Sequence, residues 1–301
     1  MVLAIYRSIQ KFTKELNNIV SYGVTGFYSD RQYTKFVLLP RNPPNFLKEK
    51  SLIATINDVD DTITDTTRYH DREDYLTYKR DRLKFIPLAI FLTIPFSTFG
   101  LPFYFKYLPN ILPRSFSTRE TKVELYKKQL NRKRENCTKL INCVAGLKQS
   151  IVKLVASTGI TSIHDIKYTM ISNLSECHTI FPTKNNNQLN SLSELLGLSS
   201  WIPNTILVDK LFNIPSSQEI DSKLVLLEIK KESLTYEDLQ DILFRKSIEF
   251  SDQQYTYQQL LDKALKYNQL VMEIKENSGD DNILFIRQYI ILQTLILDLH
   301  L

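Results

Sequence analysis

The 301-residue chain contains only seven glycines. Average usage is ~7%, so glycine occurs at roughly a third of its ordinary frequency. Turn-rich β folds, dinucleotide-binding loops and P-loops all need glycine, for positive φ angles or for close approach of the backbone to a phosphate. The scarcity of glycine therefore argues against these classes, and together with the many Leu, Ile, Lys and Gln residues it predicts an all-α fold.

Cysteine is also rare, because only Cys137, Cys143 and Cys177 are present. An odd number of cysteines without a short metal-type spacing argues against a disulfide framework or a zinc site. The sequence likewise lacks a glycine-rich phosphate loop, a His-x-x-x-His pair and a Gly-x-Ser-x-Gly elbow, and its four histidines are scattered. We therefore expect a protein that is not an enzyme and that has no cofactor and no metal site.

Residues 1–66 are expected to form an N-terminal amphipathic helix followed by an irregular linker. Apolar residues recur every three or four positions between residues 5 and 19, with basic residues between them. This pattern suits a mitochondrial import sequence, a helix lying on a membrane or a plain surface helix. Residues 20–66 are read as irregular. The acidic stretch at 58–65 lacks the Gly and Glu that an EF-hand requires, which favours a solvated linker.

Residues 67–105 are interpreted as a charged lead-in followed by a transmembrane helix at 85–105. These last 21 positions carry no charge. As a helix they would span about 31 Å at ~1.5 Å per residue, close to the thickness of a bilayer core. Pro87, Pro95 and Pro102 are the objection to a continuous helix, so a buried core helix or a re-entrant hairpin remains an alternative.

The segment 106–139 is strongly basic, with ten Lys and Arg against three acids, whereas the whole chain carries a net charge of only +5. It leads into an amphipathic pattern that predicts one helix from about Thr118 to Ser157. This basic segment suits contact with anionic lipid headgroups or with RNA phosphate, and the alternative is a solvated face. The residues chosen as the partner- or lipid-binding site are Lys122, Lys127, Lys128, Arg132, Lys133 and Arg134.

The rest of the chain, within a helical domain expected at 106–301, is predicted to consist of short helices. The apolar segment 283–301 is interrupted by charges and is interpreted as a core helix rather than a span. Three further helices have capping signals at their starts, namely Ser216 or Ser217, Thr235 with Asp238, and Thr256 with Gln259.

Two motifs carry a resemblance to a known family. In the stretch 102–116, an apolar, proline-bearing segment runs into a Leu-Pro-Asn-x-Leu-Pro-x-x-Phe sequence, whose motif residues are Pro109, Asn110, Leu112, Pro113 and Phe116. It resembles the membrane-exit motif of the leucine zipper–EF-hand-containing transmembrane protein family, and the chain is closest to the short LETM1-domain-containing branch without EF-hands. The stretch 233–239 is similar to the start of a helix in that family's ribosome-binding domain.

The resemblance implies a 14-3-3-like helical domain in the mitochondrial matrix, behind a single span of the inner membrane. It also implies association with mitochondrial ribosomes and a role in cation/proton homeostasis. The chain departs from the family pattern in two places. Arg245-Lys246-Ser247-Ile248 stands where the family has an Arg-Gly-Leu turn, and the usual Trp is missing near 265–267.

The expected function is that of a non-enzymatic inner-membrane protein that recruits mitochondrial ribosomes or other partners and so supports mitochondrial homeostasis. A cation/proton exchange system built from several copies, a homo-oligomer, is one alternative. The segment 85–105 contains no ionisable residue, which weakens this alternative because intramembrane ionisable groups usually mark an ion path. A membrane scaffold with only lipid partners is the other alternative.

Overall fold

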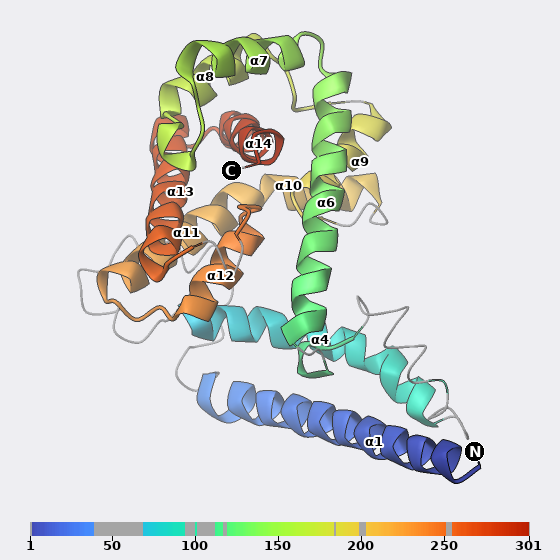
Figure 1. Cartoon of the computed structure of the whole chain (residues 1–301). Coiled ribbons are helices and arrows are strands. Elements are labelled where there is room, and N and C mark those ends of the chain that lie inside the picture. Colours follow the sequence, from blue (N-terminus) through green and yellow to red (C-terminus); the bar gives the residue numbers. More distant parts are fainter. Residues whose placement is uncertain are drawn as a thin grey trace. The chain divides into compact units, whose positions relative to one another are not determined.

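The structure is a computed structural model of the chain, and it describes residues 2–38, 69–93, 100, 112–116, 119–183, 185–198, 203–250 and 255–300. Every regular element in these ranges is a helix: eleven α-helices, two short 3-10 helices and one π-helical turn (Figure 1). The predicted all-α fold is confirmed.

The described residues divide into two compact units, with the boundary inside helix α6 between Lys127 and Lys128. Unit 1 comprises the described residues up to Lys127, and unit 2 comprises those from Lys128 onward. The domain boundaries expected at 66/67 and 105/106 lie outside the described residues.

Unit 1 is built on two long helices, α1 (Val2–Tyr33) and α4 (Tyr69–Thr93). α1 continues into the π-helical turn η1 (Thr34–Leu38) and packs against α4 and the 3-10 turn η5 (Arg114–Phe116). The expectation of irregular structure from residue 20 is wrong over residues 20–38, which are helical. Tertiary packing of this kind is what stabilises helices that propensity alone leaves marginal. The acidic stretch 58–65 lies outside the described residues.

The predicted transmembrane segment is described only in part, at residues 85–93, where it forms the end of α4, and at Gly100. No single helix in the described ranges has both the length and the apolar composition needed to cross a membrane. One pair, Val123–Cys143 with Leu147–Thr158, meets those criteria jointly but is bent by 107° at its break.

Unit 2 surrounds one apolar helix. α14 (Asn282–Asp298) contacts α8, α10, α11 and α13, and twelve of its seventeen residues are buried (Figure 1). A helix that is apolar on every side is stable in water only when it is covered on every side. The interpretation of the C-terminal segment as a core helix is confirmed. The other elements of unit 2 after α6 (Arg119–Cys143) are α7 (Leu147–Thr158), η6 (Ile163–Asp165), α8 (Tyr168–Cys177), α9 (Asn186–Leu195), α10 (Asn204–Phe212), α11 (Ile214–Lys230), α12 (Tyr236–Arg245) and α13 (Tyr257–Ser278).

The single helix predicted from Thr118 to Ser157 is in fact two helices, α6 and α7. They are separated by a turn in which Gly146 adopts φ 76°, a left-handed conformation that glycine takes without strain. The turn keeps both apolar faces in the core, because Leu140 and Leu147 on its two sides are fully buried. The apolar spacing in the sequence continues through the turn, which explains why periodicity alone predicted one helix.

The predicted helix starts at Thr235 and Thr256 are confirmed. Each threonine hydroxyl accepts a hydrogen bond from the backbone N–H three residues later. In return, the side-chain oxygens of Asp238 and Gln259 accept a hydrogen bond from the backbone N–H of Thr235 and Thr256. The start predicted at Ser216 or Ser217 is wrong. α11 begins at Ile214, with Pro215 in its first turn, where proline's missing N–H costs nothing.

Candidate functional site

The described part of the membrane-exit motif forms a buried apolar cluster in unit 1. Leu112 and Phe116 are buried together with Leu88 of α4, and Val20, Phe85 and Phe91 pack against them. The Phe116 N–H donates to the Pro113 carbonyl over 3.0 Å, which closes the η5 turn. Leu112, Pro113 and Phe116 are therefore buried structural residues, while Pro109 and Asn110 lie outside the described residues.

A lysine at the edge of this cluster contacts the motif backbone. The Lys84 ammonium donates to the Leu112 carbonyl at 3.5 Å. Burial lowers the pKa of Lys84, and the nearby Asp81 carboxylate partly offsets this effect. The contact joins the end of the charged part of α4 to the motif.

The six predicted basic site residues lie on α6 in two different environments. Lys127, Lys128 and Arg132 are exposed, whereas Lys133 and Arg134 make contacts within the fold. Lys122 is in the helix, but its side chain is outside what the structure describes. Lys139, which the predicted set left out, is exposed. Lys128, Arg132 and Lys139 are spaced by four and then seven residues, which places them on one side of a helix.

α6 is held by contacts with α9 and α14. The Asn136 amide donates to the Glu194 carboxylate at 2.7 Å and to the Arg132 carbonyl of its own helix at 2.9 Å. The buried Cys137 thiol donates to the Thr294 carbonyl of α14 at 3.8 Å. These contacts fix the helix, so the exposed basic residues from Lys128 onward are presented on a rigid support. We call Lys128, Arg132 and Lys139 the basic stripe.

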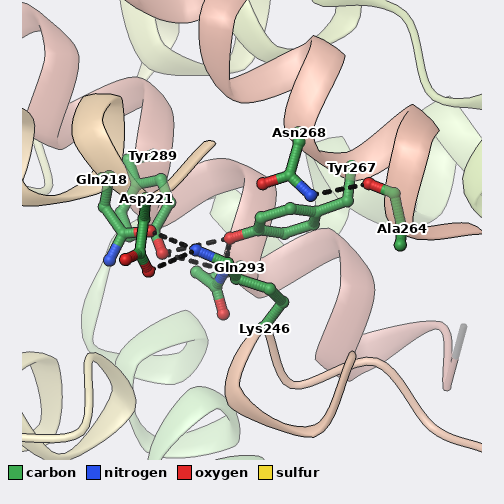
Figure 2. Close-up of polar contacts among 8 residues, drawn as sticks. All are labelled: Gln218, Asp221, Lys246, Ala264, Tyr267, Asn268, Tyr289 and Gln293. Atoms are coloured by element: carbon green, nitrogen blue, oxygen red, sulfur yellow. Dashed lines mark hydrogen bonds and ion pairs between the residues drawn. The ribbon is translucent and has the colours of Figure 1, made fainter. Parts of the chain in front are cut away.

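A buried polar network lies where α11, α12, α13 and α14 meet (Figure 2). Lys246 is only 3% exposed; its ammonium donates to Asp221 at 3.1 Å and to Gln218 at 2.9 Å. It also lies over the Tyr267 ring, 5.6 Å from the ring centre. A buried ammonium requires such partners, because desolvation without them is very costly.

The tyrosines of the network stay neutral. The Tyr267 hydroxyl donates to the Tyr289 hydroxyl at 3.0 Å and accepts from the Gln293 amide at 2.6 Å (Figure 2). Burial raises the pKa of both phenols above its ordinary value, and the Asp221 charge adds to the effect. Sequence reasoning missed this network because its members lie on three different helices and in the turn after α12, and no local spacing connects them.

Comparison with known families decides the classification. A family model described as LETM1-like, RBD matches residues 67–278, about two thirds of the chain. The chain belongs to the LETM1-like family. No solved structure matches the chain, so the 14-3-3-like arrangement stays a prediction.

One departure from the LETM1-like pattern has a local structural explanation. After α12, Ser247 adopts φ 65°, in the left-handed region where glycine is usually favoured. The Ile248 N–H donates to the Leu243 carbonyl and the Ser247 N–H to the Phe244 carbonyl, the two hydrogen bonds of a Schellman turn. Ser247 therefore makes the helix-ending turn without glycine, and it adds a hydroxyl that glycine lacks.

Proposed function

We propose that this chain is a non-enzymatic protein of the mitochondrial inner membrane whose helical unit 2 associates with mitochondrial ribosomes. Membership of the LETM1-like family supports this assignment, because the matched region is of the ribosome-binding type. The chain's role is to hold a partner at the membrane and thereby support mitochondrial homeostasis, with the C-terminal part in the matrix.

The observation that carries the proposal is the exposed basic stripe on a fixed helix. Lys and Arg side chains that neutralise phosphates release condensed counterions, which gives an affinity independent of base sequence but strongly dependent on salt. Such contacts position a protein on RNA without reading its sequence. A stripe on a packed helix loses less conformational entropy on binding than one on a loop, which favours this surface as the RNA contact.

Membrane attachment is proposed for unit 1, with a single span that includes the apolar end of α4. The described part of α4 exposes Leu83, Ile86 and Ile90, at 65%, 53% and 61% of their accessible surface. They follow the exposed basic residues Lys79, Arg80 and Arg82. Exposed apolar side chains next to basic ones are typical of a helix that meets the headgroup region and enters the bilayer.

Cosedimentation with mitochondrial ribosomes over a series of salt concentrations tests ribosome association. Replacing Lys128, Arg132 and Lys139 by Glu should weaken binding and reduce the salt slope by about one for each phosphate that is no longer neutralised. The matched control replaces Lys148 and Lys153 by Glu, because these are exposed lysines on α7. Equal binding by the stripe variant and the wild type would refute recruitment through α6.

Two further measurements separate the membrane assignments. Flotation with vesicles rich in anionic lipid shows whether the stripe variant loses lipid binding instead of ribosome binding, as a lipid-only scaffold requires. Alkaline carbonate extraction with protease protection of isolated mitochondria tests the span and its orientation together. Release of the chain by carbonate would contradict the proposed span.

A further inference from the structure

Helix α6 and the turn after α12 meet through Lys133 and Ser247. The Lys133 ammonium donates to the Ser247 hydroxyl oxygen at 2.7 Å, although the two residues are 114 positions apart in the chain. Next to this contact, the Arg134 guanidinium forms an ion pair with Glu249. Two consecutive cations of α6 are therefore attached to one short segment of unit 2.

The charges at this junction do not balance. Arg134 pairs with Glu249, and Lys246 pairs with Asp221. Within the described residues, Lys133 has no carboxylate within 4.0 Å, and its one hydrogen-bond partner is a neutral hydroxyl. Burial lowers its pKa to about 8, and the Lys246 charge contributes to this shift. One ammonium is thus held in a partly buried position beside a second cation, without an anion among the described residues to compensate it.

The hydrogen-bond donors at the junction also outnumber the acceptors. A lysine ammonium has three N–H donors, and only one of those on Lys133 has an acceptor in the described part of the chain. The Ser247 hydroxyl accepts from Lys133, and its own proton has no acceptor among the same residues. The Nε atom of Arg134 is buried and also lacks a partner there. Buried donors without acceptors are rare in folded proteins and call for an explanation.

We propose that Lys133, Ser247 and Arg134 form a binding site for a phosphate-type oxyanion. A tetrahedral oxyanion supplies several acceptor oxygens and negative charge together, which matches a cluster whose described residues leave several donors without acceptors and one cation in excess. Charge-assisted hydrogen bonds to such an ion would offset the desolvation of the ammonium. The ligand thereby fastens α6 to the turn after α12 and stabilises unit 2.

This site is separate from the basic stripe. The stripe residues Lys128 and Arg132 are exposed, whereas Lys133 and Arg134 are partly buried and already engaged with the segment 247–249. Partial burial favours a free ion over the phosphate of a large molecule. Inorganic phosphate is therefore the expected ligand, and adenosine monophosphate, which carries the same group on a bulky ester, is the comparison probe.

The experiment measures the midpoint of thermal unfolding of the full chain in phosphate and in chloride at equal ionic strength, at about pH 7. A ligand that binds only the folded state raises the midpoint in a concentration-dependent way. We expect phosphate to stabilise the wild type, adenosine monophosphate to have a much smaller effect, and Lys133→Met to abolish the response. Lys148→Met, an exposed lysine of α7 outside the basic stripe, is the matched control and should keep it.

A second arm needs no variant. Sulfate keeps its charge across the alkaline range, so its effect reports on the protein group alone. Because binding requires protonated Lys133, sulfate affinity should fall about tenfold for each pH unit above the Lys133 pKa of about 8. A site made of ordinary surface lysines would keep its affinity for sulfate up to about pH 10.

Two results would overturn the proposal. The first is an equal phosphate response in the wild type and the Lys133→Met variant, which would mean general surface or solvent effects. The second is the absence of any stabilisation of the wild type, by phosphate at about pH 7 or by sulfate across the pH series. A response to adenosine monophosphate equal to that of phosphate would overturn the assignment to a free ion and indicate a phosphate ester instead.

Discussion

The ring of Phe116 lies directly against Gly23 of α1. A Cβ atom at position 23 would be 2.2 Å from Cδ1 of that ring, far inside van der Waals contact. The glycine of the N-terminal helix and the phenylalanine that ends the exit motif are therefore complementary parts of one contact. The packing makes α1 an integral part of unit 1.

Gly23→Ala should destabilise unit 1. In an unobstructed helix this change stabilises by up to about 1 kcal/mol, because alanine has the higher helix propensity. Here the added methyl group meets the Phe116 ring, and overpacking of this kind typically costs about 1–3 kcal/mol. Thermal unfolding of the full chain measures the effect.

Gly26→Ala is the matched control, since a Cβ there would lie 3.1 Å from the Cβ of Ser115 and needs only a small shift. Combining Gly23→Ala with Phe116→Ala should remove the clash, so the two changes should be strongly non-additive. Additive effects would show that the ring is not against Gly23 in solution.

Removing one partner of the Lys246–Asp221 ion pair should lower the free energy of unfolding much more than removing both partners. Lys246→Met leaves the Asp221 carboxylate, which is 15% exposed, without its cation, and we expect a loss of about 3–5 kcal/mol in the free energy of unfolding. Adding Asp221→Leu should recover most of that loss, because the carboxylate that loses the Lys246 ammonium is removed as well. Denaturant unfolding of the single and double variants measures both values.

Lys223→Met is the control for that pair. Lys223 is more exposed, at 24%, and its partner Glu219 keeps Lys275 at 4.0 Å. The cost should therefore be clearly smaller. If both single variants lose the same free energy, burial does not set the strength of the Lys246 pair.

Local signals in the sequence predicted part of this structure well. The capping boxes at Thr235 and Thr256 lie within four residues of chain, so their spacing alone specifies the hydrogen bonds. The C-terminal core helix was equally predictable from its apolar composition. The break at Gly146 was not, because the apolar spacing of α6 continues across it into α7.

The candidate sites were less predictable, for a physical reason. A run of basic residues shows that charge is present but not which side chains face solvent. Lys133 and Arg134 meet Ser247 and Glu249, partners more than a hundred residues away, while the nearby Arg132 stays exposed. Contacts of this range depend on how the helices pack, which has no local sequence signal.

The three cysteines should react very differently with thiol reagents. Burial raises the pKa of Cys137 to about 12, and the Asp298 charge adds to this, so the reactive thiolate is almost absent near neutral pH. Cys143 and Cys177 are exposed. Maleimide labelling followed by mass spectrometry should modify these two in the folded chain and Cys137 only after unfolding. Modification of Cys137 at a rate equal to that of Cys143 would contradict the packing of α6 on α14.

Deprotonation of Lys133 should contribute stability to unit 2 in alkaline solution. The pKa of Lys133 is lowered from 10.5 to about 8 in the folded state, so between these values the unfolded chain binds a proton that the folded chain does not. The contribution of this group to stability therefore increases as pH rises from about 8 to 10.5, by an amount on the order of 2–3 kcal/mol, and it adds no pH dependence below about 7. The raised pKa values of Cys137, Tyr267 and Tyr289 act in the opposite direction over the upper part of this range, because these groups ionise first in the unfolded chain.

Denaturant unfolding in chloride buffer over that pH range measures this contribution as the difference in stability between the wild type and the Lys133→Met variant. At pH 7 the variant should be the more stable of the two, because no charge is then desolvated beside Lys246, and its advantage should shrink as pH rises toward 10.5. The difference between the wild type and Lys128→Met, on the exposed side of α6, should stay constant over the same range. A constant difference between the wild type and Lys133→Met would contradict the lowered pKa of Lys133, whose ammonium would then have to be compensated by an anionic partner.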